Sequence, residues 1–293
     1  MAACAGRATS GCGPVVGSGL GQHGCARVVS VDNLTVSYRQ HPALHHISGQ
    51  FALGSLTAVI GPNGSGKSSL LKSIMGLLKP AGGHVRVNTP RSRMAYLPQM
   101  TEIDRSFPMQ VRDCVLLGCW SALGAWGGVN AQILARADAA IHAVGLEGFE
   151  QRTVGSLSSG QFQRVLFARL LVQDADLILL DEPFNSVDSR TNAALLNLIH
   201  QWHTQGRTVI AVLHDDEQVK AHFDQTVLLA RELVAWGPTP QVLTEVHLQR
   251  ARALAEAWDD NAEICHTDES VAAAAPPGFK AHAHAGPATD ITS

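Results

Sequence analysis

Gly61-Pro62-Asn63-Gly64-Ser65-Gly66-Lys67-Ser68 is the stretch that decides the fold of this chain. It fits the phosphate-loop pattern G-x-x-x-x-G-K-[ST] at every fixed position. The apolar, β-branched run before it (residues 55–60) predicts a buried parallel strand, and the apolar spacing after it (residues 69–78) predicts a helix. A strand, a glycine loop and a helix in this order predict a site where backbone N–H groups and a helix N-terminus hold phosphate.

Each polar side chain of this loop has an expected chemical task. Lys67 is expected to reach the β- and γ-phosphates of a nucleotide, and the Ser68 hydroxyl to ligate Mg²⁺. Ser69 follows directly and is counted with the loop as a nucleotide-binding residue. The alternative is a chance glycine loop between two core elements, which would require the strand and the helix to flank it by accident.

Composition describes an ordinary folded protein with room for one large α/β core. The chain has 293 residues, of which 45% are hydrophobic and 16% charged, and its net charge of −3 gives no support for a nucleic-acid surface. Six cysteines without C-x-x-C spacing indicate reduced thiols, not a disulfide framework. The most apolar run, residues 115–129, is short for a bilayer span and interrupted by glycines.

The pattern along the chain divides it into three parts. Residues 1–26 lack periodicity and are expected to be disordered, or to follow from a wrongly assigned start codon. Residues 27–245 are expected to form the folded domain, with a helical subdomain over about 100–165 and a small antiparallel sheet ahead of the glycine loop. Residues 246–293 are expected to form a helix and a disordered, histidine-containing tail. Strands alternating with helices predict a mostly parallel, doubly wound sheet.

Three charged or polar side chains stand at predicted strand ends. Asp181 and Glu182 follow the apolar run 177–180, and His214 follows another apolar run. Because ligands bind such sheets at the carboxyl ends of strands, these residues and Lys67 are predicted to meet in one site. Asp181 is placed to hold Mg²⁺ jointly with Ser68, and Glu182 to polarise water for attack on the γ-phosphate. Taken alone, an Asp-Glu pair could equally be a solvated turn.

Further motifs accompany the glycine loop in a fixed order. They are Gln99, LSSGQ at 157–161, LILLDEP at 177–183, Asp188 and His214. Together they resemble the ATPase subunits of ABC transporters, and the pentad at 157–161 discriminates, because generic phosphate-loop ATPases lack it. The resemblance covers about residues 28–245. It implies an α/β P-loop NTPase fold of the ABC type: a mostly parallel core sheet with an antiparallel β subdomain and a helical subdomain.

The resemblance implies that two copies of the domain enclose two ATP molecules head to tail. The glycine loop of one copy would face Ser158, Ser159, Gly160 and Gln161 of the other, where a helix N-terminus adds a second dipole. The resemblance also implies that Gln99 contacts Mg²⁺ and the attacking water, and that His214 contacts the γ-phosphate. It implies that Asp188 contacts the dimer partner and that Tyr38 stacks on adenine.

Ser159 departs from the family pattern, which has glycine at this place. Serine would be costly if the position required a positive φ, and harmless if φ is negative, which is the expectation here. The departure bears on the ATPase rate and not on family membership.

Several phrases resemble the zinc- and manganese-uptake group of these subunits. They are YLPQ at 96–99, IDRSFP at 103–108, VLLG at 115–118, FNSVD at 184–188 and AWGPTP at 235–240. The resemblance implies a homodimeric ATPase that energises uptake of divalent metal, zinc before manganese. It would act through a separate integral membrane permease, supplied by a periplasmic or surface solute-binding protein. The subunit would lie peripherally on the cytoplasmic face of the inner membrane.

Other functions stay open with less support. Iron-chelate uptake ATPases carry related phrases. Soluble ABC ATPases of DNA repair or translation usually have two cassettes or a long coiled coil, which this chain lacks, and a catalytically silent regulator disagrees with the intact catalytic set. An isolated cassette suits import better than export.

Residues 118–128 suit docking onto a membrane partner or core packing. In the tail, Cys265, His266, His282 and His284 are read as unstructured, with a zinc site as the alternative.

Overall fold

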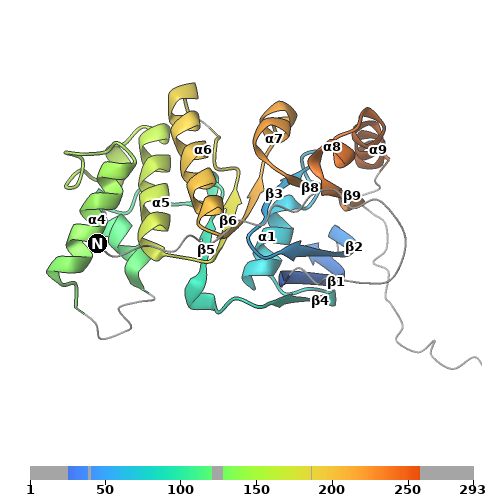
Figure 1. The fold of residues 1–293 in the computed structure, drawn as a ribbon, viewed down its shortest axis with the longest axis horizontal. Coiled ribbons are helices and arrows are strands. Elements are labelled where there is room, and N and C mark those ends of the chain that lie inside the picture. Colours follow the sequence, from blue (N-terminus) through green and yellow to red (C-terminus); the bar gives the residue numbers. More distant parts are fainter. Residues whose placement is uncertain (1–25, 39–40, 121–127, 186, 258–293) are drawn as a thin grey trace, which may run out of the picture.

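The computed structural model describes residues 26–38, 41–120, 128–185 and 187–257, which form two β-sheets and the helices that cover them (Figure 1). The predicted N-terminal extension, the centre of the 118–128 segment and the Cys- and His-containing tail lie outside these ranges. No helix within the described ranges is both long enough and apolar enough to cross a membrane.

The smaller sheet is antiparallel and consists of β1 (Arg27–Tyr38), β2 (His41–Ala52) and β4 (Gly82–Val87), in the order β2-β1-β4. The apolar residues of β1, such as Val29 and Val31, are buried, but the burial does not alternate strictly, because Val28 and Leu34–Val36 are buried as well. The antiparallel pair expected ahead of the glycine loop is therefore confirmed, and a strand that follows the loop helix completes the sheet.

The larger sheet has six strands in the order β5-β6-β7-β3-β8-β9, and only β9 runs antiparallel to its neighbour. The bounds are β3 (Leu56–Ile60), β5 (Met94–Leu97), β6 (Leu177–Asp181), β7 (Thr208–Val212), β8 (Gln225–Ala230) and β9 (Glu232–Pro238). Every residue of β3, β6 and β7 is buried, which explains their unbroken apolar or β-branched sequences. The predicted mostly parallel sheet is confirmed.

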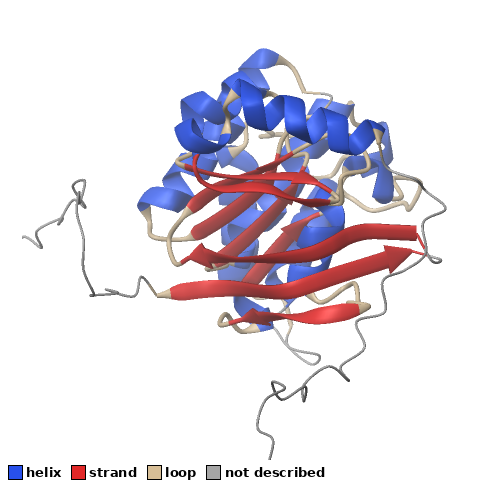
Figure 2. Cartoon of the chain, turned by 90° about the vertical axis from the view of Figure 1, so that its right-hand side faces the viewer, coloured by secondary structure: helices blue, strands red, loops and turns tan. Residues whose placement is uncertain are grey.

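Different layers cover the two faces of the larger sheet. Leu177 and Leu179 pack toward the smaller sheet and α1 (Lys67–Met75), whereas Ile178 and Leu180 pack toward the other helices. Figure 2 shows helices above the larger sheet and the long strands of the smaller sheet below it. The other helices are α2 (Val111–Leu116), α4 (Ala131–Ala143), α5 (Ser159–Gln173), α6 (Ser189–Thr204), α7 (Asp216–His222), α8 (Thr239–Val242) and α9 (Glu245–Glu256).

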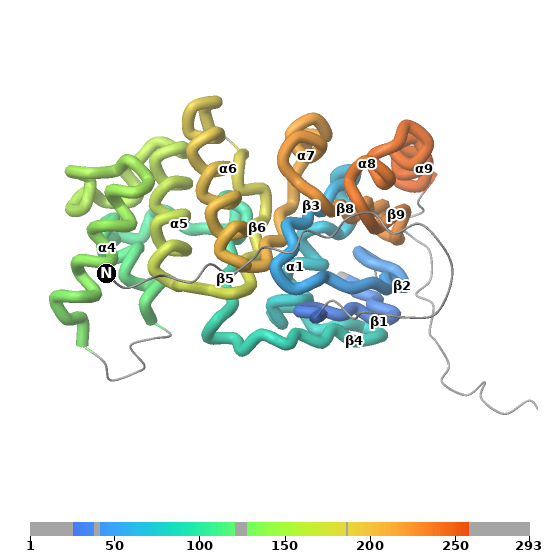
Figure 3. Tube along the Cα trace, in the orientation of Figure 1, coloured from blue at the N-terminus to red at the C-terminus, as the bar shows by residue number. Residues whose placement is uncertain are grey.

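The helices α2 and α4 pack against α5 at one end of the molecule, and α8 and α9 pack against β8 and β9 near the other end (Figure 3). Short 3-10 turns follow α2, at residues 117–119, and precede α5, at residues 154–156. Another, at 100–102, lies between β5 and α2, and one at 91–93 precedes β5. The chain thus leaves the sheet after β5, builds a helical region, and returns along α5 to start β6.

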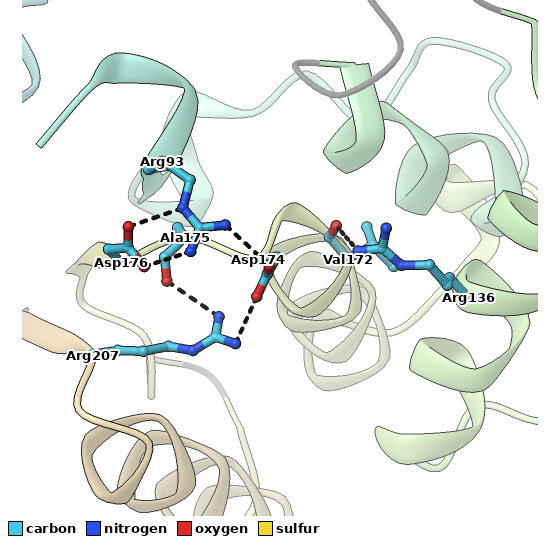
Figure 4. A network of polar contacts seen from close by, with 7 residues as sticks. All are labelled: Arg93, Arg136, Val172, Asp174, Ala175, Asp176 and Arg207. Atoms are coloured by element: carbon cyan, nitrogen blue, oxygen red, sulfur yellow. Dashed lines mark hydrogen bonds and ion pairs between the residues drawn. The ribbon is translucent and has the colours of Figure 1, made fainter.

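A network of ion pairs fixes that return (Figure 4). Arg93 donates to both carboxylate oxygens of Asp176, at 2.9 and 2.6 Å, and to Asp174 at 3.0 Å. Arg207 donates to Asp174 at 2.8 Å and to the Ala175 carbonyl at 3.2 Å. Asp174 ends α5 in a left-handed conformation with φ 50°. The network therefore holds the end of α5 against the starts of β5, β6 and β7.

Candidate nucleotide-binding and catalytic site

The glycine loop joins the end of β3 to the N-terminus of α1 inside the larger sheet. Strand β3 has β7 on one side and β8 on the other. From β3 the chain continues to β5 on the β7 side, whereas β8 leads to β9 on the other side, so the loop opens at the carboxyl edge where the connections diverge. A Cβ atom at Gly61 would lie 1.9 Å from the Leu229 carbonyl oxygen, and one at Gly66 would lie 2.2 Å from the Ala43 carbonyl oxygen. Glycine is therefore required at both places by close backbone packing.

A cavity of about 360 Å³ opens over the loop and is bordered by residues 63–69, Ala43, Gln99 and Glu182. The first N–H groups of α1 have no acceptor within the helix and point toward this end. The Ser65 hydroxyl oxygen is buried, and it finds no hydrogen-bond partner in the described part of the chain. Unsatisfied buried hydroxyls are uncommon, so the residues of this cavity fit an added anion such as a phosphate group.

Lys67 folds back onto its own loop. Its Nζ donates to the carbonyl oxygens of Gly61 at 2.9 Å and Pro62 at 2.8 Å, and the residue is only 6% exposed. Burial lowers the pKa of Lys67, while the negative charges of Glu182 and Asp181 act in the opposite direction. The ammonium group therefore lies beside the cavity, held by two carbonyl acceptors that phosphate oxygens can replace.

Asp181 and Ser68 meet as the sequence predicts. The Ser68 hydroxyl donates to Asp181 Oδ1 at 3.0 Å, and the Tyr96 hydroxyl donates to Oδ2 at 3.4 Å. Asp181 ends β6 and is 1% exposed. Burial raises the pKa of Asp181, and the hydrogen bond from Ser68 partly opposes that change. A hydroxyl and a carboxylate side by side are oxygen ligands of the kind that Mg²⁺ prefers.

Three side chains hold the carboxylate of Glu182. Its Oε2 accepts from Gln99 Nε2 at 2.7 Å and from Asn185 Nδ2, and its Oε1 lies 2.7 Å from His214 Nε2. Glu182 has a left-handed backbone, with φ 51°, and its side chain is 11% exposed. A left-handed conformation is unusual for a residue with a Cβ and often marks a functional position. The structure thus unites Gln99, Glu182 and His214 from three separate parts of the chain.

The pentad at 157–161 forms the N-terminus of α5. Ser158 caps this helix: its hydroxyl accepts from the Gln161 N–H at 3.2 Å, and the Gln161 side chain accepts from the Ser158 N–H at 3.0 Å. Ser159 begins the helix and is not among the described residues with positive φ. The expected negative φ is therefore confirmed, and serine adds no backbone strain here.

Asp188 caps the next helix, α6. Its carboxylate accepts from the Thr191 N–H at 2.9 Å and from the Thr191 hydroxyl at 2.8 Å, and these bonds lower the pKa of Asp188. Neither Asp188 nor the pentad borders the cavity over the glycine loop. One chain therefore brings together only the loop, carboxylate, glutamine and histidine parts of the predicted site.

Tyr38 ends β1, where it pairs with His41, but its side chain lies outside the described part of the structure, so adenine stacking stays a prediction. Sequence reasoning missed three contacts: Ala43 at the cavity, Tyr96 on Asp181 and Asn185 on Glu182. A signal existed for Tyr96, because it belongs to the YLPQ phrase at 96–99, and its strand β5 pairs with β6, which carries Asp181. No comparable signal existed for Asn185.

Comparisons with known proteins agree with this geometry. The sequence model of the ABC transporter family matches residues 44–185. The zinc transport system ATP-binding protein TroB of Treponema pallidum is 44% identical over 231 residues, covering 77% of this chain and 87% of the relative. The manganese transport system ATP-binding protein MntB of Listeria innocua is 40% identical over 228 residues, covering 76% of this chain and 95% of the relative.

The chain belongs to the ATP-binding subunits of ABC transporters. Like other ABC ATPases, it binds and hydrolyses ATP. Its fold matches an inward-facing metal-chelate type ABC transporter, with a TM-score of 0.69 and 28% identity over 78% of this chain and 89% of that one. It also matches a dimeric bacterial ABC transporter cassette, with a TM-score of 0.65 and 25% identity over 72% of this chain and 98% of that one. The predicted ABC-type fold is therefore confirmed.

Proposed function

We propose that this ABC ATPase energises the uptake of a divalent metal ion, zinc first and manganese next, through a separate membrane permease. The observation that carries this proposal is the identity of 40–44% to subunits named for zinc and manganese transport, across 87–95% of their length. In the same proposal two copies form a homodimer on the cytoplasmic face of the inner membrane, and a solute-binding protein delivers the metal to the permease.

Nucleotide binding would exchange bonds within the glycine loop for bonds to phosphate. Lys67 would leave the carbonyl oxygens of Gly61 and Pro62 for the β- and γ-phosphate oxygens, and the Ser65 hydroxyl would gain an acceptor. Ser68, Asp181 and Gln99 would hold Mg²⁺, which supplies positive charge against the phosphates when it is bound. The neighbouring loop glycines and Ser69 complete the nucleotide-binding set.

Hydrolysis would depend on freeing the Glu182 carboxylate. In the structure both of its oxygens already take part in hydrogen bonds with Gln99, Asn185 and His214. Gln99 would turn to Mg²⁺ and the attacking water, and His214 to the γ-phosphate. Glu182 could then accept a hydrogen bond from that water and polarise it. The nucleotide would thus both occupy the site and release its base.

The second copy would complete each site. The capped N-terminus of α5 and Asp188 do not border the cavity in their own chain, so they are available to face the glycine loop of a partner. The helix dipole and the Ser158 hydroxyl would then act on the γ-phosphate from the opposite side. Closing and reopening of this dimer would move the permease through its transport cycle.

The substitution Glu182→Gln tests this function because it keeps the shape of the side chain and removes the base. The kcat for ATP hydrolysis is expected to fall by about 100-fold or more, with ATP binding kept. The variant would replace the wild-type copy in the native host, grown without added metal, and cellular zinc, manganese and iron would be measured. Glu217→Gln is the matched control, since Glu217 pairs with Lys220 on the surface of α7.

Each metal has a defined meaning in that measurement. A fall in zinc alone supports the zinc proposal, and a fall in manganese alone moves the cargo to the second metal. A fall in iron alone would favour the chelate-uptake alternative. If the purified Glu182→Gln protein has lost ATP hydrolysis but the cells that carry it keep their metal content, the metal-uptake proposal is contradicted. Only the ATPase activity would then remain assigned.

A further inference from the structure

Asn185 contacts the catalytic carboxylate, although none of the roles assigned above requires it to. Its side-chain amide donates to Glu182 Oε2, and its backbone N–H donates to the Glu182 carbonyl oxygen at 3.3 Å. Both bonds lie within the four-residue turn 182–185 that follows β6. The contact is therefore local, because both partners belong to one turn.

The other two donors to Glu182 have a different origin. Gln99 lies 83 residues earlier, beyond β5, and His214 lies 32 residues later, beyond β7. In the proposed mechanism both turn toward the nucleotide, which removes them from Glu182. The amide of Asn185 then remains hydrogen-bonded to the Glu182 carboxylate, because both residues belong to the same turn.

This turn is anchored on the side of the helical region. Gln163 of α5 is 3% exposed, and its side-chain amide donates to the Pro183 carbonyl oxygen at 2.7 Å. The left-handed backbone of Glu182 needs such support from its surroundings. With Pro183 held by Gln163 and the carboxylate held by Asn185, the turn has a fixed backbone and a fixed side chain.

We propose that Asn185 is a positioning residue for ATP hydrolysis: its amide keeps the Glu182 carboxylate aimed at the attacking water once Gln99 and His214 have turned to the nucleotide. The proposal rests on the role given to Glu182 and is independent of the transported metal. Asn185 does not border the cavity over the glycine loop, so no contact with the nucleotide is expected of it. Substituting Asn185 is therefore expected to lower kcat and to leave the KM for ATP nearly unchanged.

Steady-state ATPase kinetics of the purified full-length protein test this proposal with two variants. Asn185→Ala removes the donor, and kcat is expected to fall about tenfold or more while the KM for ATP changes less than about twofold. Asn185→Asp keeps the size of the side chain but offers an acceptor in place of the donor, so it is expected to lose at least as much. Asn88→Ala is the control and should match the wild type, because Asn88 follows β4 and its amide donates to the Arg27 carbonyl oxygen of the smaller sheet.

A double variant separates positioning from a general effect. If Asn185 acts only through Glu182, adding Asn185→Ala to Glu182→Gln should leave the residual rate unchanged. Three results would overturn the proposal: wild-type kcat in Asn185→Asp, a raised KM with unchanged kcat, or a further loss in the double variant. ATP binding and thermal unfolding of each variant would show that it is folded. If Glu182→Gln kept full ATPase activity, the proposed role of Glu182 as the base would be wrong, independently of the results for the Asn185 variants.

Discussion

Single residues of the glycine loop are fixed by backbone packing as well as by nucleotide chemistry. At Gly61, φ is 147° and an added Cβ would meet the Leu229 carbonyl oxygen, which belongs to the core strand β8 and cannot move away. At Gly64, φ is 74° but no atom lies within 4 Å of the added Cβ. A side chain at Gly64 would therefore strain only the backbone, whereas a side chain at Gly61 would also overlap with β8.

Alanine substitutions at these two places are expected to differ. Gly64→Ala should lower the free energy of unfolding by about 1–2 kcal/mol, the cost of a left-handed alanine, and should weaken ATP binding less than Gly61→Ala does. Gly61→Ala should cost more than about 3 kcal/mol and abolish ATP binding, because the loop must shift off β8. Urea unfolding followed by tryptophan fluorescence, with nucleotide binding measured alongside, checks this. Equal losses in the two variants would contradict the packing argument.

The residues of the candidate site could be predicted from sequence to different degrees. Lys67, Asp181 and His214 could be placed together because each follows a recognisable strand, and parallel strands share one carboxyl edge. Asn185 could not, because its contact depends on the left-handed backbone of Glu182, and nothing in the sequence indicates that conformation. Tertiary conformation, not motif spacing, decides such a contact.

At the scale of elements, strands were predicted more reliably than helix ends. The buried strands β3, β6 and β7 lie where unbroken apolar or β-branched runs predicted them. The helix after the glycine loop was expected to continue to residue 78, but α1 ends at Met75. Gly76 takes a left-handed conformation with φ 69°, and its N–H and that of Leu77 bond back to the last turn. This glycine stops the helix before the Lys79-Pro80 pair.

The helices α6 and α7 meet through a histidine pair that should make stability depend on pH. His200 Nε2 lies 3.2 Å from His222 Nδ1, and burial, followed by the neighbouring His222 and His203, lowers the pKa of His200 while Asp224 opposes this. Below the ordinary value of 6.5 the unfolded chain therefore takes up this proton more readily than the folded one. The stability linked to His200 is present above pH 6.5, and it is lost as the pH falls from there through the lower pKa of His200 in the folded state.

His200→Gln is expected to reduce this loss. Urea unfolding midpoints at pH 7.5 and at pH 5.8 would be compared among the wild type, His200→Gln and His142→Gln, whose imidazole is 72% exposed. The wild type and His142→Gln should lose similar stability between the two values, and His200→Gln should lose less. If His200→Gln loses as much as the wild type, the histidine pair does not carry the pH dependence.

At the scale of the whole molecule, the two parts of the proposed nucleotide site lie apart in one chain. The glycine loop and Glu182 border the cavity, whereas the N-terminus of α5 does not. At Gly160, in the first turn of α5, an added Cβ would meet its nearest atoms at 3.9 Å, which is ordinary contact, and the backbone φ is not positive. The single chain can therefore accept a side chain at a place where a partner's nucleotide would need room.

Gly160→Leu uses this difference to test completion of the site by a second copy. The variant should keep its thermal stability and bind ATP at its own glycine loop, but it should lose ATP-dependent dimerisation and nearly all hydrolysis. Light scattering after gel filtration, in the Glu182→Gln background with ATP, measures the dimer. Gly82→Leu is the control, because its Cβ would also make ordinary contact, at 3.8 Å, but on the smaller sheet. Full hydrolysis by a monomeric Gly160→Leu protein would show that one chain forms a complete site, and it would remove the reason for placing α5 against a partner's phosphate.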